Sequence, residues 1–184
     1  RTLFGEVNPS GRLPALFPKS DDQLGEWDIN AKEVKHGLFH GYRYLDHNHE
    51  RALFPFGFGL SYTEFKVKSV IINRNKRHFS VIVGLSNAGK VDGICVPQLY
   101  VSCLNSRVER PKKELKGFGR LSLRANEKLN LEFEVRDSDL CFYDRKAGWV
   151  LEDCLYRFFI GFSSDDLPFS QTWRFDGVSW TKKA

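Results

Sequence analysis

The chain has 184 residues, of which 41% are hydrophobic and 14% aromatic, so it is long and apolar enough to fold around one sizeable core. Its formal net charge of +5 comes from 28 basic and 23 acidic residues scattered along the sequence, which argues against a nucleic-acid partner. No run approaches the ~20 apolar residues of a membrane-spanning helix, so we expect no membrane partner. Because the chain begins at Arg1 and not at methionine, we expect a piece of a longer protein, and its localisation stays open.

The first thirty residues have the pattern of an incomplete α/β layer. Gly5 is typical of the residue that ends a helix, and Asn8–Gly11 is a cluster of turn-forming residues. Residues 12–17 predict a short edge strand, and Trp27 is expected to pack beneath the polar loop that follows. A segment of this size cannot bury itself, so we expect residues 1–30 to be the C-terminal tail of an α/β sandwich domain.

Residues 31–64 are predicted to form a long connector of fixed shape. Its centre, Leu53–Tyr62, reads L-F-P-F-G-F-G-L-S-Y. Burial of each phenylalanine is worth roughly 1.5–3 kcal/mol, so a free tether is excluded. Arg43 stands between two tyrosines and is expected to anchor an interdomain carboxylate. We expect four aromatic rings of the connector to pack on a folded layer, either within this chain or outside it: Phe54, Phe56, Phe58 and Tyr62.

From residue 65 onward the apolar residues recur with the period of two that is typical of β-strands. Short strands separated by turn signals predict a mainly β fold, an antiparallel β-sandwich that spans residues 65–184. The expected strands are 65–72, 79–86, 95–103, 121–123, 129–135, 156–162 and 172–175.

The motif G-Y-R-Y-x-D, followed closely by P-F-G-F-G-L-S-Y-T, resembles the junction of glycoside hydrolase family 3, the β-glucosidase and β-xylosidase family. Further segments resemble that family in the same order: Leu3–Pro18, Gln98–Val101, Arg110–Phe118, Asp139–Asp144 and Gly161–Ser164. The resemblance implies a fibronectin type III-like (immunoglobulin-like) domain at 65–184, preceded by the tail of the α/β sandwich domain and the connector.

The resemblance also implies a non-catalytic C-terminal portion of a β-glucosidase-like enzyme, which braces the catalytic domains and is inactive alone. The family's nucleophilic aspartate lies on an N-terminal barrel, and its acid/base glutamate lies upstream of Arg1, so no residue here inherits a catalytic role. The implied partners are the missing barrel and α/β sandwich domains, with β-linked carbohydrate as a further candidate. Acidic neighbours that could pair, as glycoside hydrolysis requires, have the pattern of solvated acids: Asp21/Asp22, Asp46/Glu50, Asp137/Asp139 and Asp165/Asp166.

Two alternatives to membership of this family remain open, although we expect no cofactor and no metal site. A free-standing carbohydrate-binding module would need a surface row of aromatic rings, and interior packing is the alternative for most candidates. The candidate rings are Trp27, Tyr42, Tyr44, Trp149, Trp173 and Trp180. A metal-binding module would use the histidine cluster beside Asp46 and Glu50. The cluster comprises His36, His40, His47 and His49.

The four cysteines contain no C-x-x-C pair, so we expect no structural zinc site. Their even number permits two disulfides, but their spacing indicates no framework, and we predict four buried free thiols. Three positions depart from the family pattern. Cys95 stands where the family has an acidic residue, and Pro97 where it has an aliphatic one. Glu152–Tyr156 reads E-D-C-L-Y, with Cys154 inside it, where the family has a Pro-Gly turn. These departures affect the expected geometry of the sandwich, because proline removes a hydrogen bond from a strand ladder.

Overall fold

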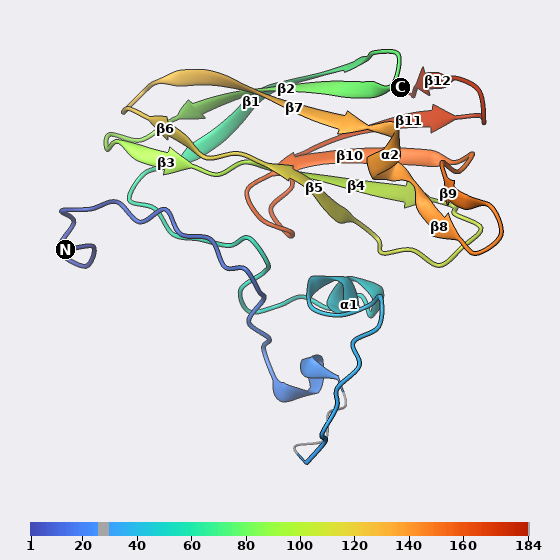
Figure 1. The fold of residues 1–184 in the computed structure, drawn as a ribbon. Coiled ribbons are helices and arrows are strands. Elements are labelled where there is room, and N and C mark those ends of the chain that lie inside the picture. The colour runs from blue at the N-terminus through green and yellow to red at the C-terminus, as the bar shows by residue number, and fades with distance from the viewer. Residues whose placement is uncertain (26–29, 184) are drawn as a thin grey trace.

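The computed structural model describes residues 1–25 and 30–183, and Trp27 therefore lies outside the described residues. The fold is mainly β, with two antiparallel sheets packed face to face (Figure 1). None of the helices in the described residues is long and apolar enough to cross a bilayer. The predicted mainly β sandwich is confirmed.

The first sheet has the order β1-β2-β7, with β2 (His78–Asn87) between β1 (Phe65–Arg74) and β7 (Lys128–Arg136). Along β2, the side chains of Phe79, Val81, Val83 and Leu85 are at most 1% exposed. The alternation read in the sequence therefore places the apolar face of this strand in the core, as residues i and i+2 share one face of a strand.

The second sheet has the order β12-β11-β10-β4-β5. Its strands are β4 (Gln98–Leu104), β5 (Glu114–Phe118), β10 (Leu155–Gly161), β11 (Phe169–Phe175) and β12 (Trp180–Lys182). The core closes between the two sheets, where the ring of Phe79 lies 4.8 Å from that of Phe158 and 5.2 Å from that of Trp173. Such aromatic pairs stabilise a core beyond the area they bury.

The strand expected at 95–103 is two strands, and this part of the prediction was wrong. β3 (Gly93–Cys95) pairs with β6 (Leu121–Leu123), whereas β4 pairs with β5 and β10. Pro97 lies at the break. Because proline has no N–H to donate, the ladder is interrupted there, and its carbonyl accepts a bond of 3.1 Å from Gly119 N. The chain changes sheets at this point.

The alternation of apolar residues in the sequence did not predict several short elements. They are α2 (Asp137–Leu140), the hairpin of β8 (Phe142–Asp144) and β9 (Gly148–Val150), and the edge strands β5 and β12. β5 reads E-L-K-G-F, and its two apolar residues, Leu115 and Phe118, are three positions apart, so no alternation marks it as a strand. The edge strand expected at 12–17 is absent, and the segment contributes only the isolated bridge from Phe17 to Phe54.

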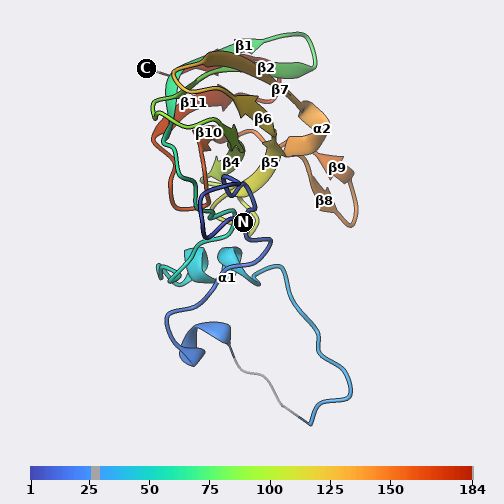
Figure 2. The same ribbon diagram turned by 90° about the vertical axis from the view of Figure 1, so that its left-hand side faces the viewer.

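The N-terminal region, residues 1–64, lies on one side of the sandwich (Figure 2). Gly5, at φ 78°, ends the first turn as expected: Gly5 N donates to Thr2 O and Glu6 N to Arg1 O, the pattern of a Schellman motif. The remaining helical elements there are η1 (Asp21–Leu24) and α1 (Tyr42–His47). The proposed division at residues 30 and 64 remains a prediction, although β1 does begin at Phe65.

Candidate functional site

The predicted acidic pairs hold structure together or face solvent. Asp46 Oδ1 and Oδ2 accept bonds of 2.6 and 2.7 Å from Lys113 Nζ. Asp137 accepts two bonds of 2.7 Å from Arg74. Asp139 accepts a bond of 2.8 Å from Arg136 N at the start of α2. The other members are exposed or half-buried surface acids: Asp21, Asp22, Glu50, Asp165 and Asp166.

The four histidines of the connector do not form one group. The rings of His36 and His40 lie 5.9 Å apart, whereas the ring of His47 packs on Phe39 at 4.4 Å. The ring of His49 lies on the sandwich side, with Nδ1 2.9 Å from Lys112 Nζ. Within residues 1–25 and 30–183, the group of possible metal ligands whose donor atoms meet contains none of these histidines.

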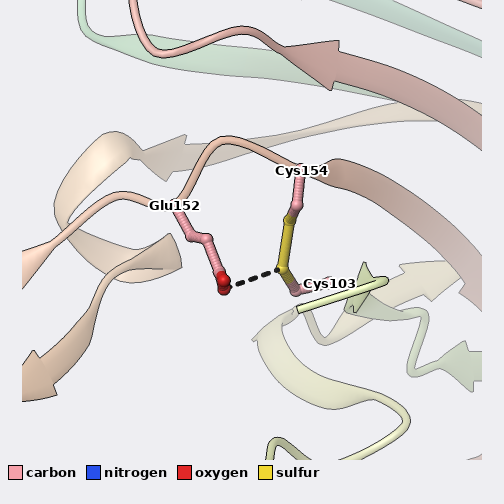
Figure 3. Close-up of side chains that lie close together, drawn as sticks. All are labelled: Cys103, Glu152 and Cys154. Carbon is pink, nitrogen blue, oxygen red and sulfur yellow. Dashed lines mark hydrogen bonds between the residues drawn. A yellow bond between two sulfur atoms is a disulfide. The ribbon is translucent and has the colours of Figure 1, made fainter. Parts of the chain in front are cut away.

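That group consists of Cys103, Glu152 and Cys154, and the two cysteines form a disulfide (Figure 3). The prediction of four buried free thiols was therefore wrong for this pair and correct for Cys95. Cys141 is free as predicted, but it is half-buried. The spacing of the cysteines indicated no disulfide framework, because the two cysteines are 51 residues apart and meet only when β4 pairs with β10. Burial raises the pKa of the Cys95 thiol to about 12.

Glu152 is 5% exposed and lies beside the disulfide. Its carboxylate accepts bonds of 2.6 Å from Ser106 Oγ and 2.6 Å from Arg107 N. Glu152 Oε2 lies 3.8 Å from Cys103 Sγ. A buried carboxylate needs such partners, because an ionised group without hydrogen bonds is costly to remove from water. The side chain is thus fixed in place, pointing at the sulfur atoms.

A second cluster joins the connector to the sandwich through Gln98, which is 3% exposed. Gln98 Nε2 donates to Gly57 O at 3.1 Å and to Phe162 O at 2.8 Å, and its Oε1 accepts 2.6 Å from Tyr100 Oη. Ser164 N donates to the connector at Phe56 O, at 2.9 Å. Because these polar groups are buried and satisfied, they fix one register of the connector on the sheet. We call this cluster the Gln98 latch.

Helix α1 docks beside the latch through ion pairs. Arg43 Nη2 lies 3.2 Å from Glu114 Oε1 on β5, so Arg43 does pair with a carboxylate. That this contact is interdomain rests on the division at residue 64 and stays a prediction. The Asp46–Lys113 pair lies next to it, with both side chains about 15% exposed. The ring of Tyr42 stacks on Phe56 at 5.0 Å. These contacts hold α1 against the sandwich.

The opposite side of the N-terminal region has no partner within the described residues. Leu13 N donates to Phe58 O and Phe17 N to Phe54 O, so residues 8–17 run along residues 53–62. Between them lies an apolar groove, which we call the uncovered face. Its lining includes Leu13, Phe17, Phe54, Phe58 and Leu60. Phe17 is 53% exposed, Phe54 39% and Leu60 69%.

Among the predicted sugar-stacking rings that the structure describes, Trp173 is buried, and three others are half-buried: Tyr42, Tyr44 and Trp180. Trp173 is 8% exposed, and the ring of Trp180 lies 4.8 Å from Phe79. Trp149 differs, because it is 72% exposed at the β8–β9 hairpin and pairs across the strands with Tyr143, which is 63% exposed. The ring centroids of this pair lie 5.6 Å apart.

Two family models match the chain: the glycosyl hydrolase family 3 C-terminal domain at residues 1–62, and the fibronectin type III-like domain at residues 95–164. Among curated proteins, the chain is 35% identical to thermostable beta-glucosidase B of Acetivibrio thermocellus, over 98% of the chain and 25% of that protein. It is 34% identical to beta-glucosidase BoGH3A of Bacteroides ovatus, over 94% of the chain and 25% of that protein.

A solved structure agrees with the computed fold. The GH3 beta-glucosidase of Bifidobacterium adolescentis matches with a TM-score of 0.86 and 31% identity, covering 95% of this chain and 27% of that one. The chain thus spans about a quarter of the length of the relatives it matches. The chain belongs to glycoside hydrolase family 3, and it carries the C-terminal segment of such enzymes together with their fibronectin type III-like domain.

Proposed function

We propose that this chain is the non-catalytic bracing portion of a β-glucosidase-type parent enzyme, in which other domains hydrolyse the O-glycosyl bond. The observation that carries the proposal is the uncovered face. It is a row of exposed apolar rings on a region that the Gln98 latch holds rigidly against the sandwich. Its proposed occupant is the α/β sandwich domain that precedes this segment in the parent.

The two sides of the connector explain how bracing would work. One side offers polar groups that are already bonded to the sandwich, and the other offers apolar rings that favour burial. A domain that covers these rings is therefore fixed relative to the sandwich, because the connector cannot bend at the Gln98 latch without breaking buried hydrogen bonds. The names of the relatives favour β-glucosides as the substrate class of the parent.

Two measurements on the 184-residue chain test the proposal. We expect no hydrolysis of an aryl β-glucoside, because the acids of the predicted pairs are engaged in ion pairs or hydrogen bonds or lie on the open surface. We expect binding of a hydrophobic dye at the uncovered face, with Leu60→Ser lowering the signal. Val178→Ser is the matched control, since Val178 is 91% exposed on the far part of the sandwich. Hydrolysis of the aryl β-glucoside by this chain, if it is lost in Asp46→Ala or Glu50→Ala, contradicts the proposal.

A second candidate function, carbohydrate binding, is favoured by the exposed pair Tyr143 and Trp149. Aromatic rings stack on the apolar faces of pyranose sugars, and the paired hydroxyl and indole N–H can bond to sugar hydroxyls. The test is tryptophan fluorescence during titration with a β-linked gluco-oligosaccharide. Quenching that is lost in Trp149→Ala and kept in Tyr62→Ala supports the site, and an unchanged spectrum of the wild-type chain removes it.

A further inference from the structure

We propose that Cys103, Glu152 and Cys154 form a redox-gated zinc site, in which the disulfide and a thiolate-bound Zn²⁺ are alternative states of the same two sulfur atoms. The absence of a C-x-x-C motif argued against zinc in the sequence. In the structure, β-sheet pairing brings the two cysteines and a carboxylate together (Figure 3). The proposal rests on this geometry and does not depend on the function of the parent enzyme.

The donor set suits a borderline-soft divalent ion. Zinc binds thiolate and carboxylate ligands in tetrahedral sites. The three candidate donor atoms all lie within 4.8 Å of one another. The distance of 3.8 Å between Cys103 Sγ and Glu152 Oε2 is close to the sulfur–oxygen edge of about 3.5 Å that tetrahedral zinc would require. Cys103 Sγ and Glu152 Oε2 are therefore already near the separation that they need as zinc ligands.

The sulfur–sulfur edge can open without a change in the sheet. The Cα atoms of Cys103 and Cys154 are 6.6 Å apart. After reduction, rotation of the two side chains can separate the sulfurs toward the roughly 3.8 Å edge around zinc. Cys154 lies just before β10, and its carbonyl accepts a bond of 3.0 Å from Phe175 N, so the backbone stays in place and the opening comes from rotation of the side chains. The fourth position would be open to water, since Cys103 is only half-buried.

The surroundings hold the carboxylate ready and balance the charge. Ser106 Oγ and Arg107 N, each 2.6 Å from Glu152, fix the orientation of the carboxylate, as outer partners of metal ligands do. Two thiolates, one carboxylate and Zn²⁺ sum to one negative charge. The Arg107 guanidinium, 3.8 Å from Glu152 Oε1, neutralises that charge.

A dithiol or phosphine reductant converts the disulfide state into the state that can bind zinc. The reductant supplies two electrons, the Sγ–Sγ bond breaks, and each sulfur takes one proton to give two thiols. The reductant becomes a cyclic disulfide or a phosphine oxide, the latter with an oxygen atom from water. Binding of Zn²⁺ then releases both thiol protons, so the affinity must rise with pH. For the return step, an added small-molecule disulfide takes up the two electrons and two protons from water and becomes two thiols, while the Sγ–Sγ bond forms again and Zn²⁺ leaves.

The experiment is a titration of the 184-residue chain with Zn²⁺ by calorimetry and with Co²⁺ by absorption, with and without a phosphine reductant. We expect one site per chain in the reduced protein, with a sulfur-to-cobalt charge-transfer band, and no such band in the oxidised protein. Cys103→Ser and Cys154→Ser should abolish the band. Glu152→Gln should weaken binding by at least about 10-fold, the lower value for loss of an outer partner, because it removes a charged ligand.

Cys95→Ser and Cys141→Ser are the matched controls, because these thiols are free and belong to neither state of the site. Equal binding by the oxidised and reduced chains overturns the proposal, as does reduced protein without the cobalt band. Loss of the folded circular-dichroism spectrum on reduction alone also overturns it. If the Cys103 and Cys154 variants fail to fold, the comparison of oxidised with reduced wild-type protein decides the outcome.

Discussion

The two regions of this molecule use the same kinds of residue in opposite ways. In the sandwich, the rings of Phe79, Tyr156 and Phe158 are fully buried. In the described part of residues 1–64, Leu45 is the one large apolar side chain that is buried, whereas Phe17 and Leu60 are more than half exposed. Both regions are rich in phenylalanine and leucine, so composition does not explain the difference.

The difference teaches where the packing partner of each region lies. Strands of the sandwich find their partners within the chain, through the pairing of β1 with β2 and of β4 with β10. The N-terminal region buries its polar backbone at the Gln98 latch and leaves its apolar rings open. Substitutions in the two regions should therefore respond differently to the presence of the parent's other domains.

The largest effect is expected in the sandwich core. Phe158→Ala removes a fully buried ring that packs on Phe79 and should lower the free energy of unfolding by about 3–5 kcal/mol. Phe118→Ala is the matched control, because that ring is 69% exposed on an edge strand and should change stability by less than about 0.5 kcal/mol. Chemical denaturation of the chain measures both. Equal losses of stability in the two variants would show that the ring of Phe158 does not belong to the stabilising core.

The second effect is expected at the Gln98 latch. Gly57 has φ 79°, and a Cβ there would collide with the Gln98 side chain. Gly57→Ala should cost about 3 kcal/mol, from left-handed strain of about 1–2 kcal/mol and from displaced hydrogen bonds of about 1 kcal/mol each. Gly37→Ala, where a Cβ meets open space, should be close to neutral. A neutral Gly57→Ala by thermal denaturation would mean that the connector is not latched.

A third test separates the two faces of the connector. Phe56 is half-buried against Tyr42, so Phe56→Ala should cost about 2 kcal/mol in the isolated chain, roughly half of the value for a fully buried ring. Phe54, at 39% exposed on the uncovered face, should matter less in the isolated chain and more in a full-length parent. Melting temperatures of both variants in both contexts measure this. A Phe54→Ala effect that is identical in both contexts contradicts docking at the uncovered face.

The smallest effect is a pH dependence at α1. Burial raises the pKa of Asp46 above its ordinary value of 3.8, against the opposing hydrogen bond from Lys113. The folded state therefore holds this proton more tightly than the unfolded state. Stability should fall as pH rises from about 4 through the raised pKa, and the Asp46→Asn variant should lack this component. The check is to measure the unfolding free energies of the wild-type chain and of Asp46→Asn across the acidic pH range. The wild-type minus variant difference should fall as pH rises, and a difference that rises with pH would contradict the prediction.

The sequence by itself determined the class of the fold and much of its strand pattern. Alternating apolar residues such as Phe79, Val81 and Val83 lie on one face only if the segment is a β-strand. This strand could therefore be predicted directly from the sequence. Gly5 likewise marked the end of a helical turn, because glycine adopts a positive φ without strain. Ordered motifs also identified the family, whose models match the chain at both ends of the junction.

Tertiary structure alone decided the sites. The Cys103–Cys154 bond needs two residues 51 positions apart to meet, and no local pattern encodes a contact of that range. The pairing of β3 with β6, the pairing of Arg43 with Glu114 and the role of Gln98 follow in the same way from which strands become neighbours. Local periodicity records which face of a strand is apolar, whereas the identity of the residue that lies opposite is fixed only when the two sheets close on each other.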